Sequence, residues 1–460
     1  MDATTEAIAG YVASLDGGDL TPEATAAATL RIVDAVGCAI GGLDGPPAVI
    51  ARRLAAETRG TRRGATVFGS DAPSSMDMAA FANAVMVRYL DFNDMYFTER
   101  GGGGHPSDML APLLAVGEAV GASCRQLITA AVAAYEVNGT LAGQVWLRPR
   151  GWDQGLNIVA AVAMGAGKLL GLSQEQLGHA LSLAVTPHVP VRQTRVGELS
   201  MWKGCATAGA ARNGIFAALL AEQGMTGPPD PYEGKSGLWE LVTGPFEIRF
   251  PAWETGFAIE HAATKMHPAE YNAQAPLDLM TQLRPEIPLA EVDSIDVDTY
   301  FLAYDEIGSQ VEKWDPQTRE TADHSIPYLL AVALVDGGIG RASFTRERIL
   351  DPALRPLMAK IEVHHNEEFT ERFPGELNCA ITVRLASGKE VSGHLTHPRG
   401  HPRNPIERAD LDAKYRRIVA EYRPPAESAA CEEALAALWS IDDADDLSEV
   451  IEPLRSLSGA

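Results

Sequence analysis

Cysteine is scarce in this 460-residue chain, and its spacing argues against several kinds of site. The five cysteines are far apart and form no C-x-x-C pair, so a zinc ribbon or a cysteine-ligated iron–sulfur cluster has little support. An odd number of cysteines and the absence of a signal-peptide pattern at the N-terminus favour a reduced protein. No apolar run reaches the roughly 18–20 residues of a membrane span. We therefore expect a cytoplasmic protein that does not enter a membrane.

Positive charge is also in short supply. The chain has 38 Lys and Arg residues against 61 Asp and Glu residues, which gives a net charge of −23. Such an acidic surface repels phosphate backbones, so we expect no nucleic-acid partner. Any site for an anionic substrate must gather its own Arg, Lys and His. Hydrophobic residues make up 46% of the chain, enough for a full globular core.

Several catalytic motifs are missing as well. The Gly234-Lys235-Ser236 segment lacks the earlier glycine and the preceding strand of a P-loop, and no G-x-S-x-G occurs. His364 and His365 are adjacent on an expected strand, where side chains alternate, so they cannot easily share a metal. We expect neither a metal nor another cofactor.

The pattern of apolar and capping residues predicts a mainly α protein with a smaller α+β domain. Residues 1–267 are expected to be almost entirely helical, with Thr21-Pro22 and Ser173/Gln176 marking two helix starts. Residues 268–400 form the smaller domain, with a helix opened by Pro268, a strand over 292–301 and a hairpin over 379–395. Residues 401–460 are helical again and return to the first domain, so both chain termini build the large helical domain and the α/β domain is a lid-like insertion.

Chemistry concentrates in the stretch 89–114, YLDFNDMYFTERGGGGHPSDMLAPLL. Asp91 and Asp94 are one turn apart, so on a helix their carboxylates would share a face. Gly101–Gly104 cannot form a regular element and would let the backbone approach a ligand. His105 follows, and Ser107 or Asp108 is placed to cap a helix from Met109 onward. A solvated surface connection is the alternative, but the crowding of acids and a histidine beside this loop favours a site that binds and deprotonates a small anion.

Three further segments carry candidate polar groups. Lys203 precedes an Ala/Gly-rich helix, where a cation can bind a carboxylate, and Arg195 lies close before it; a surface patch explains both equally well. Glu270 and Gln274 are spaced to share a helix face, although exposed polar residues are the simpler explanation. The segment TADHSIPY at 321–328 places an acid, a histidine and a tyrosine around a helix start, and simple capping is an equal alternative.

Taken together, the segments resemble the MmgE/PrpD family, which includes 2-methylcitrate dehydratase, cis-aconitate decarboxylase and iminodisuccinate epimerase. The resemblance covers nearly the whole chain in family order. It rests on LDFND at 90–94, GHPSD at 104–108, WDQ at 152–154, KLLGL at 168–172, SMWKG at 200–204, AARNG at 210–214, GMTGP at 224–228, HPAEYNAQ at 267–274, TADHSIPY at 321–328 and HPRGHPRNP at 397–405. It implies a metal-independent homodimeric enzyme that acts on a small di- or tricarboxylate.

The resemblance carries an active site over to Asp91, His105, Lys203, Tyr328 and the face of Glu270 and Gln274. Our catalytic candidates are Asp91, His105, Lys203 and Tyr328, and our substrate-binding candidates are Asn93, Asp153, Gln154, Arg195, Glu270, Gln274 and His324. Asp91 and His105 would exchange protons, Lys203 and Arg195 would hold carboxylates, and Tyr328 would donate a proton or a hydrogen bond.

The closest functional expectation is a lyase like 2-methylcitrate dehydratase that eliminates water from a hydroxy acid. The sequence departs from that branch at Met95, where Thr is usual, and at Gln154, where His is usual and where Gln cannot exchange a proton near neutral pH. A decarboxylase or epimerase working through the same carbanion-like state is the alternative. A non-catalytic binding protein on the same fold is the second alternative.

Overall fold

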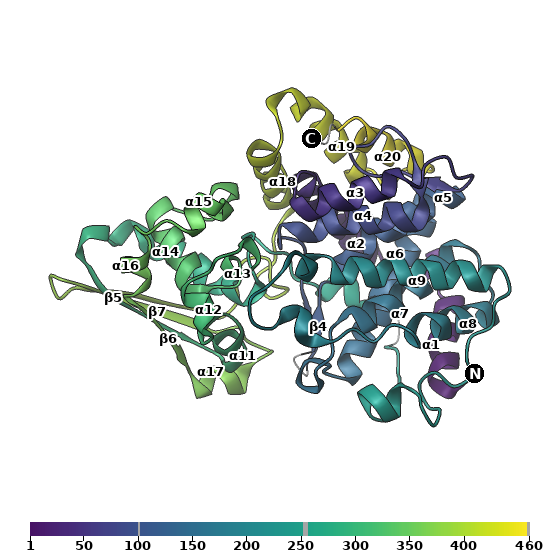
Figure 1. Ribbon diagram of the computed structural model, residues 1–460, viewed down its shortest axis with the longest axis horizontal. Coiled ribbons are helices and arrows are strands. Elements are labelled where there is room, and N and C mark those ends of the chain that lie inside the picture. The colour runs from purple at the N-terminus through teal and green to yellow at the C-terminus, as the bar shows by residue number, and fades with distance from the viewer. Residues whose placement is uncertain (100–101, 252–255, 458–460) are drawn as a thin grey trace. The chain divides into compact units, whose positions relative to one another are not determined.

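The computed structural model describes residues 1–99, 102–251 and 256–457. The chain divides into two compact units (Figure 1). The first comprises Met1–Thr194, Gly204–Ala262 and Arg408–Ala460, and the second comprises Arg195–Lys203 and Ala263–Glu407. Both chain ends therefore contribute to the first unit, which we call the helical unit, and the second, the sheet unit, is inserted between them. This confirms the expected fold class.

The helical unit is built from α-helices drawn from both ends of the chain. They are α1 (Ala3–Ser14), α2 (Pro22–Gly42), α3 (Pro46–Ala56), α4 (Met76–Tyr89), α5 (Leu110–Val120), α6 (Cys124–Gln144), α7 (Gly155–Leu169), α8 (Gln174–Val185), α9 (Ala206–Glu222), α18 (Arg408–Tyr422), α19 (Ser428–Trp439) and α20 (Leu447–Arg455). Two helix starts follow the sequence signals. Thr21 caps α2 with Pro22 as its first residue, and Ser173 and Gln176 form a capping box at α8, so both predictions are confirmed.

Small residues let the central helices of this unit approach closely. A Cβ on Gly214 of α9 would lie 2.7 Å from the backbone oxygen of Val159 on α7, closer than atoms can pack. The Ala/Gly-rich composition of these two helices is therefore explained by their packing against each other inside the unit.

The C-terminal helices α18 and α19 complete the helical unit by packing on α2. Tyr415 of α18 fits against Gly37, and Ile418 fits against Gly41, where a Cβ would lie 2.8 Å and 2.5 Å from these side chains. By length and composition α2 could cross a membrane, contrary to the expectation that no apolar run is long enough. However, 78% of its most apolar window is buried inside the protein, as in the core helix of a globular fold.

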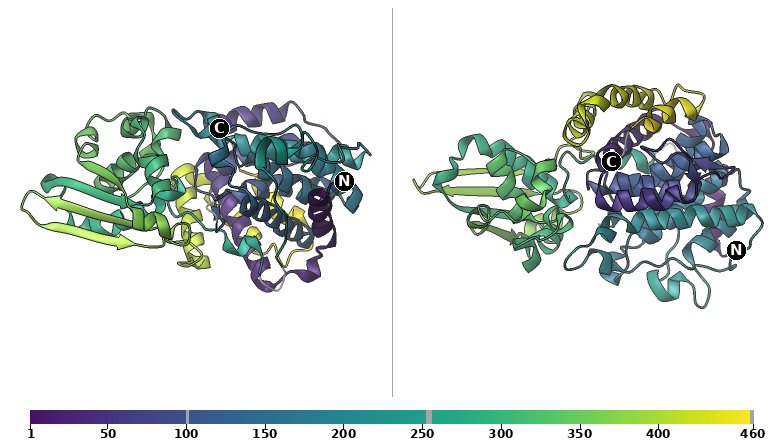
Figure 2. Two further views of the ribbon diagram at one scale, coloured as in Figure 1. Left: turned by 90° about the horizontal axis from the view of Figure 1, so that it is seen from below. Right: turned by 45° about the horizontal axis from the view of Figure 1, so that its top comes forward.

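The sheet unit contains a four-stranded sheet of order β6-β5-β7-β8, whose strands lie side by side in Figure 2. Its strands are β5 (Val292–Thr299), β6 (Ile361–His365), β7 (Cys379–Leu385) and β8 (Glu390–Leu395). Its helices are α10 (Gln274–Leu283), α11 (Phe301–Ala303), α12 (Val311–Trp314), α13 (Arg319–Ala322), α14 (Ile326–Asp336), α15 (Arg346–Ile349), α16 (Arg355–Met358) and α17 (Glu367–Arg372). Strands β5 and β6 are parallel and the other pairs antiparallel, and α10 and α14 pack against the sheet. The predicted hairpin is confirmed as β7–β8.

Some element boundaries differ from the sequence prediction. The strand predicted over 292–301 ends at Thr299, and Phe301 begins α11 with an exposed side chain. Pro268 does not open a helix, because residues before Gln274 form turns and a short 3-10 segment held by side chains. These differences arise where tertiary contacts, rather than periodicity, determine the backbone conformation.

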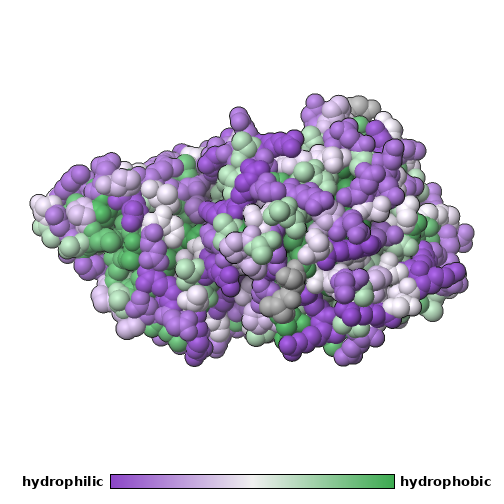
Figure 3. Space-filling view, turned by 90° about the horizontal axis from the view of Figure 1, so that it is seen from above, coloured by the Kyte–Doolittle hydropathy of each residue, from purple (hydrophilic) through white to green (hydrophobic). Residues whose placement is uncertain are grey.

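The face of the molecule drawn in Figure 3 is predominantly hydrophilic, in keeping with the net charge.

Candidate active site

A strained turn after α4 begins the candidate site in the helical unit. Among the described residues Asp91 is the one non-glycine residue with a positive φ, at 51°. Its carboxylate lies 2.5 Å from the Arg88 guanidinium, and both side chains are 1% exposed. A left-handed conformation at a non-glycine residue is costly, so this buried ion pair helps to hold it. The sequence predicted that Asp91 and Asp94 share one face of a helix. Helix α4 ends at Tyr89, before both residues, so that prediction is wrong.

A buried hydrogen-bond network joins this turn to the residues after the glycine loop. The Asn93 side-chain amide donates to Ser107 Oγ and to Asp108 Oδ1, each at 2.8 Å. The Asp94 carboxylate accepts from the Ser107 backbone and hydroxyl and from the Tyr135 hydroxyl. Neither Ser107 nor Asp108 caps the following helix as predicted, because both serve this network within a 3-10 turn before α5.

Burial raises the pKa of two acids in this network. The loss of hydration raises the pKa of Asp94 above its ordinary value, and it raises the pKa of Asp108 to about 6. The Arg88 guanidinium, with Nε 3.7 Å from Asp108, opposes the shift at Asp108. Asp108 can therefore change protonation state near neutral pH.

His105 is held in one tautomer. Its Nδ1 lies 2.7 Å from the backbone oxygen of Asp94, and a carbonyl oxygen can only accept, so Nδ1 carries a proton. In the neutral imidazole, Nε2 is then the atom that can take a proton. His105 is 9% exposed, and its backbone N–H donates to Gln154 Oε1 at 3.0 Å.

The glycine loop is more ordered than expected. Gly103–Gly104 forms strand β4, which pairs with β3 (Tyr96–Phe97), so the prediction that the glycines form no regular element is wrong for these two residues. Gly101 lies outside the described residues. A Cβ on Gly104 would lie 1.6 Å from Gln154 Oε1, so only glycine leaves room for the amide that holds His105.

Asp153, the neighbour of Gln154, has a capping contact. Its side chain is fully buried, and Oδ1 accepts from the backbone N–H of Gly155 at the start of α7, at 3.1 Å. The sequence predicted a substrate-binding residue here. The observed contact supports a role in orienting the loop that carries Gln154.

In the sheet unit, the Asp323 carboxylate contacts several charged side chains. Asp323 is completely buried, and its oxygens lie 3.1 and 3.3 Å from Lys203 Nζ. Arg319 also donates to this carboxylate, at 3.2 Å. Lys203 is only 3% exposed, so its charge is compensated by Asp323 within the protein.

Asp323 also orients His324. Its Oδ1 accepts from His324 Nδ1 at 2.6 Å, which leaves Nε2 as the proton-accepting atom of the neutral ring. The His324 side chain is 16% exposed, so it is not sealed from solvent. Burial lowers the pKa of nearby Lys313, and Asp323 opposes that shift. The segment thus places an Asp–His pair beside cations.

Glu270 and Gln274 do not share a helix face. Glu270 caps a 3-10 turn by accepting from the Asn272 backbone at 2.6 Å, and its own N–H donates to the backbone oxygen of Asp323. The Gln274 amide accepts from the backbone of Met266 and His267 and donates to two backbone oxygens. These contacts tie the loop to the Asp323 segment and support a structural role for Gln274.

Tyr328 and Arg195 complete the predicted set. Tyr328 is fully buried in the hydrophobic core of the sheet unit, where its hydroxyl donates to the backbone oxygen of Ser343, and burial raises its pKa. These contacts support a packing role better than proton donation. Arg195 donates to the backbone oxygen of Lys203 at 3.5 Å.

The predicted residues therefore fall into two groups, one in each unit. Sequence reasoning missed several charged residues that hold these groups in place. Arg88 had no periodic or motif signal of its own, Asp108 was considered only as a possible helix cap within GHPSD, and Asp323 only as an acid near a helix start.

Comparisons with known proteins find matching family models and similar enzymes. The model of the MmgE/PrpD N-terminal domain matches residues 6–251, and that of the MmgE/PrpD C-terminal domain matches residues 267–440. The chain is 26% identical to 2-methylcitrate dehydratase of Cupriavidus necator over 426 residues, covering 87% of this chain and 86% of the relative. It is 27% identical to 2-methylcitrate dehydratase of Salmonella typhi, covering 81% of each chain. It is 26% identical to human cis-aconitate decarboxylase, covering 90% of this chain and 88% of the relative.

Proposed function

The chain belongs to the MmgE/PrpD family and is a lyase of that family, and we propose that it eliminates water from a small hydroxy-di- or tricarboxylate. Two of the relatives named above are 2-methylcitrate dehydratases, and their matches cover most of both chains. The observation in this protein that carries the proposal is the fixed tautomer of His105, which provides a proton-accepting Nε2.

Dehydration needs two proton transfers. A base removes the proton from the carbon beside a carboxylate, the C–O bond to the hydroxyl group breaks, and a C=C bond forms. An acid protonates the departing hydroxide, so the products are an unsaturated acid and water. Cations must stabilise the negative charge that develops on the carboxylate as the proton leaves.

Groups of the helical unit suit the proton transfers. We assign the proton-accepting role to His105 through Nε2, because its Nδ1 is occupied by the Asp94 carbonyl. Asp91 is assigned the partner acid/base role, and its ion pair with Arg88 fixes its position. Gln154 holds the backbone of His105 and exchanges no proton itself, which accounts for an amide at a position where the dehydratase branch has His.

Groups of the sheet unit suit carboxylate binding and a share in the protonation of the departing hydroxide. Lys203 is the proposed carboxylate ligand, and Asp323 holds its ammonium group in a fixed place. We assign a proton-transfer role to His324, because Asp323 fixes its Nδ1 proton in the way that a carboxylate orients the histidine of a catalytic triad. Asp323 is then a positioning residue.

Decarboxylation is the second candidate reaction, and the match to human cis-aconitate decarboxylase favours it over epimerisation. Loss of CO₂ and loss of a proton both leave negative charge on the same type of carbon, so the same cations and acids could serve either reaction. Epimerisation through that state is the third candidate. A binding protein without activity could bind a carboxylate through Lys203, but ligand binding alone does not require two histidines held in single tautomers.

We further propose that the reaction needs no metal, that the protein is cytoplasmic and that it forms a homodimer. The dimer rests on the family resemblance, since the Ala/Gly-rich helices α7 and α9 are occupied by their contact with each other. Light scattering at micromolar concentration tests the dimer, and a monomeric mass would contradict it.

The reaction class is tested by incubating the protein with a panel of citrate-like and other hydroxy acids. Absorbance of the new alkene reports dehydration, released CO₂ reports decarboxylation, and proton NMR of recovered substrate reports epimerisation. We expect alkene formation without CO₂. If CO₂ is released in step with product, the reaction is a decarboxylation and not a dehydration. If the protein turns over no member of the panel, the proposal is contradicted.

A further inference from the structure

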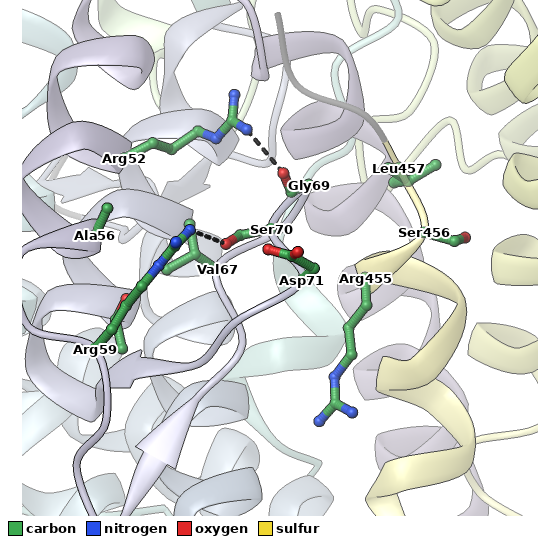
Figure 4. Close-up of a pocket in the computed structure, with 11 residues that line it drawn as sticks. Arg52, Ala56, Arg59, Val67, Gly69, Ser70, Asp71, Arg455, Ser456 and Leu457 are labelled. Carbon is green, nitrogen blue, oxygen red and sulfur yellow. Dashed lines mark hydrogen bonds between the residues drawn. The ribbon is translucent and has the colours of Figure 1, made fainter.

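A cavity of about 400 Å³ opens in the helical unit among residues that have no part in the proposed reaction. Helix α3 and the turn after it, the segment around Gly69, and the end of α20 line this cavity (Figure 4). The volume lies in the range of sites that hold small metabolites. We call it the α3–α20 pocket; its lining residues are Arg52, Ala56, Arg59, Val67, Gly69, Ser70, Asp71, Ser74, Arg455, Ser456 and Leu457.

The polar groups of this pocket are incompletely satisfied. Ser74 is completely buried, and its hydroxyl has no hydrogen-bond partner among the described residues. The Nε of Arg52 is buried and likewise lacks a partner there, although one terminal nitrogen donates to the Gly69 backbone oxygen at 2.8 Å. Buried polar atoms are nearly always paired, so an unpaired hydroxyl and an unpaired guanidinium N–H in one pocket indicate a ligand that accepts hydrogen bonds.

Positive charge dominates the lining. Arg52 and Arg59 face the pocket, and Arg59 donates to the Ser70 hydroxyl, a neutral partner, at 3.1 Å (Figure 4). Arg455 is neutralised by Glu118 and Glu452, with contacts of 2.9 and 2.8 Å. Among the described lining residues Asp71 is the single acid, and Asp44, outside the lining, offsets part of the charge of Arg52.

The sequence shows the same concentration of charge. The segment ARRLAAETRGTRRG, residues 51–64, contains five arginines and one glutamate in a chain whose net charge is −23. This local excess of arginine makes the segment positively charged in an otherwise acidic protein, and local positive charge attracts anions. Guanidinium groups also match the geometry of phosphate and carboxylate oxygens.

From these observations we propose that the α3–α20 pocket binds a small anion with at least two negative charges, of the phosphate or carboxylate class. Arg52 and Arg59 provide the charge, and Ser74 donates a hydrogen bond through its hydroxyl. The proposal does not depend on the reaction of the enzyme, because none of the lining residues belongs to the proposed catalytic or substrate-binding groups.

The test is direct binding of pyrophosphate and, in a separate arm, citrate, by calorimetry and by thermal shift without turnover. The wild-type protein should bind at least one of them saturably. The double variant Arg52→Ala/Arg59→Ala should lose at least tenfold in affinity. Arg53→Ala is the matched control, since Arg53 is an exposed neighbour of Arg52 on α3 outside the lining, and it should bind like the wild type. The arm in which the Arg52 and Arg59 variants lose affinity identifies phosphate or carboxylate chemistry, because citrate also resembles the proposed substrates of the active site.

Two further variants keep the test decisive if the double variant does not fold. Arg59→Ala removes an exposed side chain and should weaken binding several-fold, and Ser74→Ala should weaken it without lowering the melting temperature of the free protein. The proposal is overturned if neither anion binds, if the Arg59 and Ser74 variants bind like the wild type, or if Arg53→Ala loses as much affinity as Arg59→Ala. The substrate panel described above is read separately, so either proposal can fail alone.

Discussion

Replacing Asp323 by Asn tests how the sheet unit supports the reaction. The substitution keeps the shape of the side chain but removes the charge that compensates Lys203 and Arg319. Breaking a buried ion pair by removing one partner costs about 3–5 kcal/mol, because the remaining charge stays out of water. For a domain of this size each kcal/mol lowers the melting temperature by about 2–4 °C, so a fall of roughly 10 °C is expected.

The rate should fall for a separate reason. An amide can present its NH₂ group to His324 and so no longer fixes the proton on Nδ1. Loss of one general acid–base contribution corresponds to about 10²–10⁴-fold in turnover. His324→Ala should show the same loss of turnover with little loss of stability, since its side chain reaches solvent.

Calorimetry gives the melting temperatures, and turnover of the best substrate from the panel gives the rates. His365→Ala is the control, because His365 is an exposed histidine of the same unit with no proposed role. If Asp323→Asn remains stable, or if the folded variant turns over at the wild-type rate, the assignment of Asp323 as the positioning residue is wrong.

Three other expectations follow from the structure. Gly104→Ala should abolish most activity, because its Cβ would displace the Gln154 amide from His105, whereas Gly18→Ala, with open space around it, should be silent in the same assay. The buried carboxyl of Glu136 has its pKa raised by burial from 4.5 to about 7, so its contribution to stability is present below pH 4.5 and is lost as the pH rises through about 7, by up to about 3 kcal/mol. Glu136→Gln should therefore flatten the fall of melting temperature between pH 4.5 and 8, and an unchanged pH profile would refute that assignment. Activity should survive dialysis against a chelator, and a loss that a divalent ion restores would refute metal independence.

The fold could be read largely from the sequence because its signals are local. Thr21 and Ser173 cap their helices through contacts three residues away, and the alternation of Ile295 and Val297 with polar residues marks a half-buried strand. Phe301 was predicted to continue this alternation on the strand, but the chain turns into α11 after the strand and leaves the side chain exposed. A periodic pattern alone does not mark where such a turn begins.

The arrangement of the candidate site could be read only in part. Asp91 pairs with Arg88 only three positions earlier, but neither the positive φ of Asp91 nor the contact of Arg88 with Asp108 is visible in the sequence. Asp323 is adjacent to His324 in sequence, but its role as the carboxylate that also binds Lys203 spans 120 positions. Residue types and motifs identified the positions, whereas their contacts required the structure.

Proton transfer by His105 underlies the proposed reaction. The most direct measurement is turnover of His105→Ala on the substrate that the panel identifies, with the melting temperature measured on the same preparation. We expect a loss of at least ~10²-fold in turnover with a nearly unchanged melting temperature. His179→Ala, which changes a half-buried histidine of α8 with no proposed role, should keep the wild-type rate. A folded and fully active His105→Ala protein would contradict the account.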